Sequence, residues 1–148
     1  MENYNHYERK IISNKNRFNL PHKDKNELKK KFNNANILLT GAAGSIGKAF
    51  CKDLLKYNFK KIYLFDKNEN ELTELNRELI ASLNKKKIKK IKYICSDLTS
   101  ININNFLTDY KISHYLNFAA LKHVRSEEEL ISLKYMFLTN SKNFLPLK

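Results

Sequence analysis

The chain has 148 residues, of which 42% are hydrophobic and 29% charged, and this is enough for one domain with a buried core. Its net charge of +13 is compatible with a nucleic-acid or an acidic-membrane partner, but the lysines are scattered among asparagines, which favours a compositional bias. Without an aromatic-lined basic groove, no nucleic-acid partner is expected. No apolar run reaches the roughly 20 residues that span a bilayer, no signal peptide is present, and the two cysteines lack metal-ligand spacing, which together predict a cytoplasmic protein without a metal site.

Residues 1–35 are polar and rich in lysine and asparagine, and they are expected to form an N-terminal extension of short helices. One of these helices is predicted to start at Pro21 and to run through Phe32, because proline favours the first turn of a helix. The role of this extension does not follow from its sequence. Residues 36–148 are assigned to one α/β domain.

All three glycines of the chain lie in the segment Gly41–Gly47, between a short apolar strand that ends at Thr40 and a helix over residues 48–55. In such a unit the first glycine permits a tight turn, the second lets a pyrophosphate approach the backbone, and the third lets the helix pack on the strand. The spacing therefore favours dinucleotide binding over an ordinary glycine turn. The residues assigned to the cofactor here are Gly41, Ala43, Gly44, Ser45, Ile46 and Gly47.

Residues 60–66 are expected to form the second strand, which ends in Asp66, 19 residues after Gly47. An acid at about this offset binds the adenosine ribose and repels a 2′-phosphate, so NAD is favoured over NADP. Lys67 follows directly and partly offsets that repulsion, which keeps NADP possible. Asn68 and Glu71 form a capping box for a helix over residues 69–83, whose inward face is predicted to hold Leu72, Leu75, Leu79 and Ile80.

The chain continues with a basic connector at residues 85–90, interpreted as a solvated loop in preference to a contact with a polyanion, and a third strand over residues 88–95. Asp97 and Leu98 follow that strand, where ligands bind in a doubly wound sheet. A helix near residues 101–107, a fourth strand over 111–118, the small residues Ala119 and Ala120, and an amphipathic helix over 130–138 complete the order. This alternation predicts a Rossmann-type doubly wound parallel sheet, comprising its N-terminal half, the fourth strand and the following helix.

The glycine segment and the stretch F-A-A-L-K-H-V-R-S-E at residues 118–127 carry a family resemblance. The chain resembles the extended short-chain dehydrogenases/reductases, and within them the polysaccharide-biosynthesis branch of nucleotide-sugar 4,6-dehydratases and epimerases. The glycine motif is shared by the whole superfamily, whereas A-A-L-K-H-V is much narrower. The resemblance covers residues 36–140.

The resemblance implies a nicotinamide cofactor and a UDP-N-acetylhexosamine type of substrate, in a homo-oligomer when the family's full length is present. It implies that the backbone of Gly41–Gly47 holds the pyrophosphate. It further implies that Asp66 binds the ribose, Asp97 and Leu98 the adenine, and Ala119 and Ala120 the nicotinamide half. It places Lys122 at both cofactor and substrate, and His123 at the substrate; His123 is equally consistent with a packing residue that caps a helix.

The family places its acid/base residues well beyond the fourth strand, and no Tyr-x-x-x-Lys pair follows that strand here. The chain is therefore expected to be a cofactor-binding portion, truncated before the catalytic and substrate regions and inactive alone. An alternative is a non-catalytic Rossmann module that binds NAD or a protein partner. A third interpretation, nucleic-acid binding through the lysines, predicts affinity that falls steeply with salt.

Overall fold

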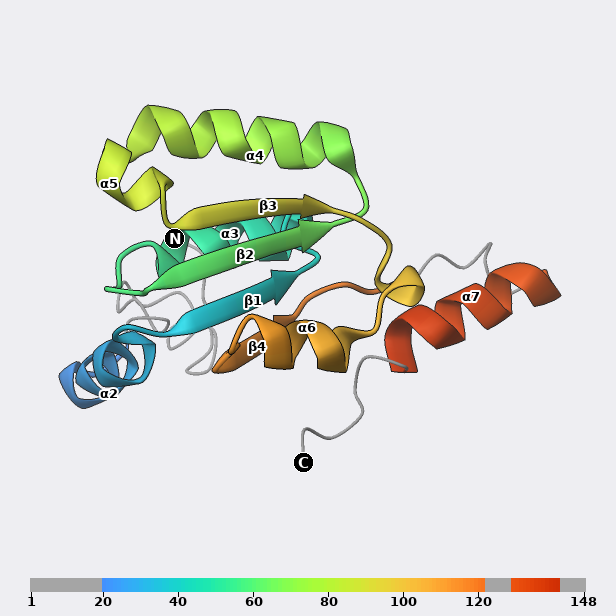
Figure 1. The fold of residues 1–148 in the computed structure, drawn as a ribbon, viewed down its shortest axis with the longest axis horizontal. Coiled ribbons are helices and arrows are strands. Elements are labelled where there is room, and N and C mark those ends of the chain that lie inside the picture. The colour runs from blue at the N-terminus through green and yellow to red at the C-terminus, as the bar shows by residue number, and fades with distance from the viewer. Residues whose placement is uncertain (1–19, 122–128, 142–148) are drawn as a thin grey trace, which may run out of the picture.

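A computed structural model gives the fold of residues 20–121 and 129–141 (Figure 1). Its centre is a parallel four-stranded sheet with the strand order β3-β2-β1-β4. The strands are β1 (Asn36–Thr40), β2 (Lys61–Asp66), β3 (Ile91–Cys95) and β4 (His114–Asn117). This is the predicted doubly wound arrangement, in which the order reverses direction between β1 and β4.

Seven helical segments connect or flank the strands. They are α2 (His22–Phe32), α3 (Ser45–Leu54), α4 (Glu69–Ser82), α5 (Lys85–Ile88), the 3-10 turn η1 (Leu98–Ser100), α6 (Ile103–Asp109) and α7 (Leu130–Ser141) among the described residues. The predicted helix after Pro21 is confirmed as α2. The expectations for residues 1–19, which belong to the N-terminal extension, lie outside the described residues.

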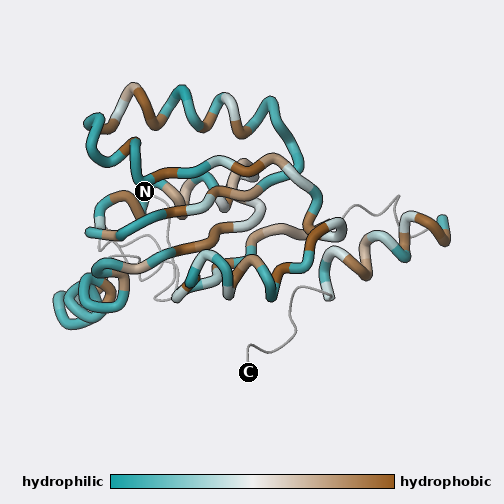
Figure 2. Tube along the Cα trace, viewed as in Figure 1, coloured by the Kyte–Doolittle hydropathy of each residue, from teal (hydrophilic) through white to brown (hydrophobic). Residues whose placement is uncertain are grey.

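The central strands β1 and β2 are buried on both faces, as their nearly continuous apolar runs require. On one face Ile37, Leu39, Ile62 and Leu64 pack against α3 and α4. On the other face Leu38, Tyr63 and Phe65 pack against Leu98 and Leu107, which come from η1 and α6. Figure 2 shows the apolar stretches of the central strands, and an α4 on which hydrophilic residues alternate with apolar ones.

The basic connector was predicted to be a loop, and this is wrong, because residues 85–88 form the short helix α5. The Asn84 side chain caps it by accepting a hydrogen bond from the Lys87 N–H at 2.9 Å. The strand β3 consequently begins at Ile91 rather than at residue 88. The fourth strand also begins later than predicted, at His114, since Lys111 lies in a left-handed turn with φ of 49°.

Two predicted apolar faces also differ from the structure. Ile80 was placed on the inward face of α4, but it is 51% exposed, while Leu72, Leu75 and Leu79 are buried as predicted. Helix α7 was expected to be amphipathic, yet Ile131 and Phe137 on it are 84% and 67% exposed. Within the described residues, no helix combines the length and the apolar character needed to cross a membrane.

Candidate functional site

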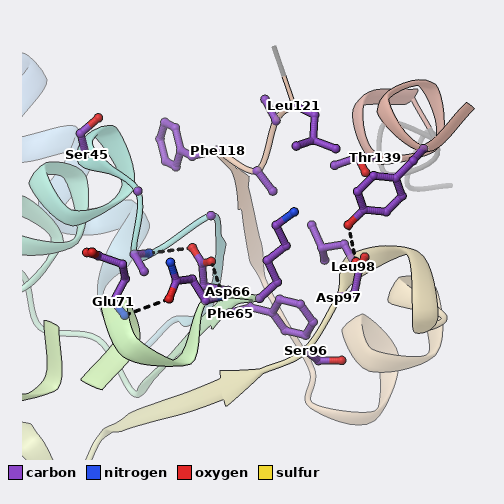
Figure 3. Close-up of a pocket in the computed structure, with 18 residues that line it drawn as sticks. Ser45, Phe65, Asp66, Glu71, Ser96, Asp97, Leu98, Phe118, Leu121 and Thr139 are labelled. Carbon is purple, nitrogen blue, oxygen red and sulfur yellow. Dashed lines mark hydrogen bonds between the residues drawn. The ribbon is translucent and has the colours of Figure 1, made fainter. Parts of the chain in front are cut away.

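A cavity of about 450 Å³ opens at the carboxyl edge of the sheet (Figure 3). Residues from all four strand ends and from α7 line it, which is where ligands bind in open α/β sheets. The lining residues are Gly41, Ala43, Gly44, Ser45, Phe65, Asp66, Lys67, Asn68, Glu71, Ser96, Asp97, Leu98, Phe118, Ala119, Ala120, Leu121, Tyr135 and Thr139.

The glycine turn after β1 is compact for two separate steric reasons. Gly41 has a φ of 66°, and a Cβ added to it would lie 2.5 Å from the Ala119 nitrogen at the end of β4. A Cβ on Gly47 would lie 2.0 Å from the carbonyl oxygen of Gly41, so the first turn of α3 packs directly on the loop. A Cβ on Gly44 would make only an ordinary contact at 3.4 Å. Gly44 is therefore the glycine that leaves open space in front of the backbone.

Helix α3 begins at this turn without a side-chain cap. Its first internal hydrogen bond joins the Lys48 N–H to the Gly44 carbonyl at 2.8 Å. The N–H groups of Ser45, Ile46 and Gly47 precede that bond, and no described side chain accepts from them. Uncapped N–H groups and the helix dipole together favour an anion at this position.

Asp66 at the end of β2 organises the neighbouring turns. Its Oδ2 accepts a hydrogen bond from the Ala43 N–H at 2.9 Å, and its Oδ1 accepts one from the Asn68 N–H at 3.0 Å. The carboxylate thereby joins the glycine turn to the start of α4. Each carboxylate oxygen has a second acceptor position, so these two bonds leave Asp66 able to accept from a ligand hydroxyl.

Asp97 lies on the opposite side of the cavity and contacts α7. The Tyr135 hydroxyl donates a hydrogen bond to Asp97 Oδ2, and the Thr99 N–H and hydroxyl both donate to Oδ1 at 2.8 Å. Lys67 Nζ lies 5.3 Å from the centre of the Tyr135 ring. Burial raises the pKa of the Asp97 carboxyl, but the hydrogen bonds from Tyr135 and Thr99 and the charge of Lys67 outweigh it and hold that pKa below its ordinary value.

The end of β4 is fixed by a polar contact with β1. The Thr40 hydroxyl donates to Asn117 Oδ1 at 2.6 Å, and the Ala119 N–H donates to the same oxygen at 3.1 Å. Thr40 is fully buried, so this bond satisfies a hydroxyl that would otherwise be costly. The contact positions Ala119 beside Gly41 at the floor of the cavity.

The cavity brings together most of the residues that were predicted to bind the cofactor. Ten of them line it: Gly41, Ala43, Gly44, Ser45, Asp66, Lys67, Asp97, Leu98, Ala119 and Ala120. Ile46 and Gly47 do not, because Ile46 is 62% exposed and Gly47 is packed beneath the turn. Lys122 and His123 lie outside the described residues.

Several lining residues were missed by the sequence analysis, notably Phe65, Ser96, Phe118, Tyr135 and Thr139. Phe65, Ser96 and Phe118 adjoin strand ends, so their position alone could have indicated them. Tyr135 and Thr139 are four residues apart on α7 and thus share one helix face, but nothing in the sequence indicates which face meets the sheet.

The charged side chains around the cavity are mainly acidic. Among the described lining residues, Asp66, Glu71 and Asp97 are carboxylates and Lys67 is the one cation. Glu71 forms an ion pair with Lys48 at 2.5 Å, which offsets part of this charge.

The fold and the site together define the class of protein: a Rossmann-type α/β fold with a cavity at the carboxyl edge of its parallel sheet, a fold that solved short-chain dehydrogenases share. A solved structure of Pen from Bacillus thuringiensis is 26% identical, with a TM-score of 0.59 over 75% of this chain and 33% of that chain. A short chain dehydrogenase from Escherichia coli CFT073, solved in complex with NADPH, is 18% identical, with a TM-score of 0.57 over 77% of this chain and 50% of that chain.

Residues 37–140 match the family described as polysaccharide biosynthesis protein, and the chain belongs to this family. Capsular polysaccharide biosynthesis protein CapD of Staphylococcus aureus is 29% identical over 97 residues, which make up 66% of this chain and 16% of CapD. The polysaccharide-biosynthesis family inferred from the segment at residues 118–127 is thereby confirmed. The chain spans a small part of the length of these relatives.

Proposed function

We propose that the cavity binds a nicotinamide dinucleotide, and that the chain is the cofactor-binding portion of a nucleotide-sugar 4,6-dehydratase or epimerase of polysaccharide biosynthesis. The observation that carries the proposal is the uncapped start of α3 behind the exposed Gly44, at the mouth of a cavity of about 450 Å³. The NADPH found in a protein of the same fold supports it.

The proposed binding mode follows the lining residues. The pyrophosphate is met by the N–H groups at the start of α3, the ribose by Asp66, and the adenine by Asp97 and Leu98. The nicotinamide half lies along Ala119 and Ala120, whose small side chains leave the backbone accessible. When bound, the cofactor supplies reversible hydride transfer at the sugar, while the residues of this chain bind and orient it. The roles of Lys122 at the cofactor and the sugar nucleotide, and of His123 at the sugar nucleotide, remain predictions.

We favour NAD over NADP as the cofactor. A 2′-phosphate near Asp66 would meet a cavity lined by three carboxylates and one described cation, Lys67. Coulomb repulsion then disfavours the extra charge of NADP more than Lys67 offsets it. Comparison of NADH and NADPH affinities tests this preference directly, and tighter binding of NADPH would overturn it.

The wider organisation is also a proposal. Residues 36–148 are proposed as the cofactor-binding domain and residues 1–35 as an extension, although Phe32 at the end of α2 is buried in the same core as β1. A cytoplasmic location, a UDP-N-acetylhexosamine substrate and homo-oligomers of the whole protein belong to the same proposal. The chain alone is proposed to bind the cofactor without turnover.

Titration with NADH, followed by isothermal calorimetry, tests the binding site. Replacement Gly44→Val places a branched side chain where the pyrophosphate would lie, at a residue whose φ of −68° suits any side chain. We expect it to fold normally and to lose at least tenfold in NADH affinity. The matched control Ala81→Val introduces the same residue at an exposed position on α4 and should bind like the unmodified chain. Equal NADH affinity in both variants would refute the pyrophosphate position.

A turnover assay tests the inactivity of the chain alone separately from its binding of the cofactor. Incubation of the chain with NAD and UDP-N-acetylglucosamine is expected to yield neither a 4-keto sugar nor an epimer. Formation of either product would disprove inactivity of the chain alone. Absence of any dinucleotide binding in the calorimetric titration would instead refute the cofactor assignment itself.

A further inference from the structure

Exposed lysines gather at the amino edge of the sheet, on the side opposite the cavity. Five of them define what we call the amino-edge basic surface: Lys60, Lys61, Lys85, Lys86 and Lys89. Figure 1 shows α5 and the start of β2 at this edge, whereas η1 and α7 lie at the other end of the strands. The fold thus brings some of the lysines that are scattered in the sequence together at one edge of the sheet.

Two chain segments build this surface and are bonded to one another. The Lys87 ammonium donates to the Leu55 carbonyl at 2.6 Å, and the Lys90 ammonium donates to the Phe59 carbonyl at 2.8 Å. The Ile62 N–H donates to the Lys90 carbonyl at 3.0 Å. These contacts hold the segment before β3 against the segment before β2, so their remaining lysines share one edge.

Within residues 20–121 and 129–141, no acid forms an ion pair with the lysines of this surface. Residues 79–96 contain six lysines and no aspartate or glutamate. The carboxylates of Asp53, Glu71, Glu74 and Glu78 on α3 and α4 are instead engaged in ion pairs with Lys56, Lys48, Arg77 and Lys52, respectively. Lys60, Lys61, Lys85, Lys86 and Lys89 form no ion pair with any residue that the structure describes.

Only some of the lysines in these two segments form bonds that stabilise the fold. Lys87 reaches a carbonyl at the end of α3, where a cation is favoured by the helix dipole, and Lys90 reaches a loop carbonyl. The five lysines of the amino-edge basic surface make no such contacts with the part of the chain that the structure describes, and their like charges repel one another. Repulsion between clustered lysines lowers the stability of the fold, and no bond within the described residues compensates for it. Such a cluster points to a partner outside the protein.

The chemistry of the surface distinguishes between anionic partners. Single-stranded nucleic acids are held by exposed aromatic rings that stack on the bases. The aromatic residues of the two segments, Tyr57, Phe59 and Tyr93, are buried or partly buried in the structure. Lysines without stacking rings are instead suited to an anionic lipid surface, which attracts each lysine near it by about 1 kcal/mol.

We propose that the amino-edge basic surface docks the protein on an anionic lipid bilayer, without insertion of any helix. Docking through this edge leaves the cavity, at the carboxyl edge of the same strands, facing away from the lipid and open to ligand. The proposal concerns a surface outside the cavity and does not depend on the identity of the cofactor.

Vesicle flotation tests this proposal. The full chain is mixed with vesicles of phosphatidylcholine, or of phosphatidylcholine with phosphatidylglycerol, over a series of NaCl concentrations. Binding is expected only to the vesicles that contain phosphatidylglycerol and should weaken steadily as NaCl increases. The variant K85Q/K86Q/K89Q spares Lys87 and Lys90, which hold the fold, and should bind on the order of 100-fold more weakly.

The control K23Q/K29Q/K134Q removes the same charge from exposed positions on α2 and α7 that form none of the ion pairs above. The fold-loss of vesicle affinity in this control should be less than a tenth of the fold-loss in K85Q/K86Q/K89Q. Both variants should keep the circular dichroism spectrum of the unmodified chain. An equal loss in the two variants would overturn the proposal, because net charge alone would then explain the binding. Failure of the unmodified chain to float, or tighter binding to single-stranded DNA than to the anionic vesicles at the same salt, would overturn it as well.

Discussion

Asn140 on α7 forms two hydrogen bonds with the backbone of Leu121, which lies four residues after the end of β4. Asn140 Oδ1 accepts from the Leu121 N–H at 2.9 Å, and Asn140 Nδ2 donates to the Leu121 carbonyl at 2.7 Å. One amide side chain therefore satisfies both polar groups of a residue in an irregular segment. The contact connects α7 to the cavity floor across 19 positions of sequence.

Replacement Asn140→Asp should destabilise the protein at neutral pH by about 1–2 kcal/mol, because the donated bond is lost and a carboxylate oxygen faces the Leu121 carbonyl. That repulsion raises the pKa of the new carboxyl in the folded state above its unfolded value. The deficit should therefore shrink as the pH falls through the raised pKa, since the protonated acid can donate again.

Urea denaturation followed by circular dichroism at neutral and mildly acidic pH measures this effect. Asn140→Ala removes both bonds and should show no recovery in acid, and Asn26→Asp on the exposed side of α2 serves as the control for the charge change. A deficit for Asn140→Asp that is independent of pH would contradict the prediction.

The hydrogen bond between Tyr135 and Asp97 should stabilise the fold over a range of pH that is limited on both the acid and the alkaline side. Replacement Tyr135→Phe removes only the hydroxyl and is expected to cost about 1 kcal/mol at neutral pH, as both side chains are partly exposed. Asp97 keeps its two bonds from Thr99, so the fold should survive.

The limits follow from the two pKa shifts. The pKa of Asp97 is lowered, so the contribution is complete above the ordinary aspartate value of about 3.9 and is lost as the pH falls through the folded pKa. The pKa of Tyr135 is raised, first by its hydrogen bond to Asp97 and then by burial. The contribution is therefore complete below about pH 10 and is lost as the pH rises through the raised value. A difference between the unmodified chain and Tyr135→Phe that persists in strong acid would refute this assignment.

The parallel sheet could be predicted because local signals agreed with the fold. The apolar runs of β1 and β2 must be buried on both faces, and the glycines, Asp66 and Asp97 each follow a strand, which places them at one edge. Asn68 caps α4 as expected, accepting from the Glu71 N–H at 3.2 Å. Each of these features depends on a short stretch of sequence, in which hydrophobic pattern, turn residues and capping residues all favour the same structure.

The errors occurred where tertiary contacts override those preferences. Residues 85–90 look like a solvated loop because of their lysines, but Asn84 caps a turn of helix and two ammonium groups bind carbonyls of the neighbouring segment. The part of the cavity formed by Tyr135 and Thr139 was not predictable either, since α7 is apolar on several sides and the sequence does not select the side that meets η1.

The two cysteines should differ sharply in reactivity. Cys51 is buried on α3, and burial raises the pKa of its thiol to about 12, so almost no thiolate forms at neutral pH. Cys95 is exposed at the end of β3. A disulfide reagent is expected to modify one thiol per chain in the native protein and both in denaturant, and the variant Cys95→Ser should react only after unfolding. Rapid modification of native Cys95→Ser would contradict the burial of Cys51.

Substitutions of the three glycines in the turn should differ in their effect: those at Gly41 and Gly47 should reduce stability, whereas the one at Gly44 should not. Gly41→Ala forces a side chain into the left-handed region and against the backbone of Phe118 and Ala119, and Gly47→Ala drives a Cβ into the Gly41 carbonyl. Each should lower the free energy of unfolding by more than about 3 kcal/mol, a large fraction of the stability of a small domain. Gly44→Ala meets only an ordinary contact and has an extended backbone, so it should change that free energy by less than about 0.5 kcal/mol.

Urea denaturation of the three variants provides the comparison, with NADH affinity measured on Gly44→Ala. The physical distinction is that Gly41 and Gly47 are surrounded by protein backbone, whereas the space in front of Gly44 is open. If Gly44→Ala proved as destabilising as Gly47→Ala, the open space at Gly44 would be filled by protein rather than reserved for a pyrophosphate. Unchanged stability in Gly47→Ala would refute the close packing of α3 on the turn.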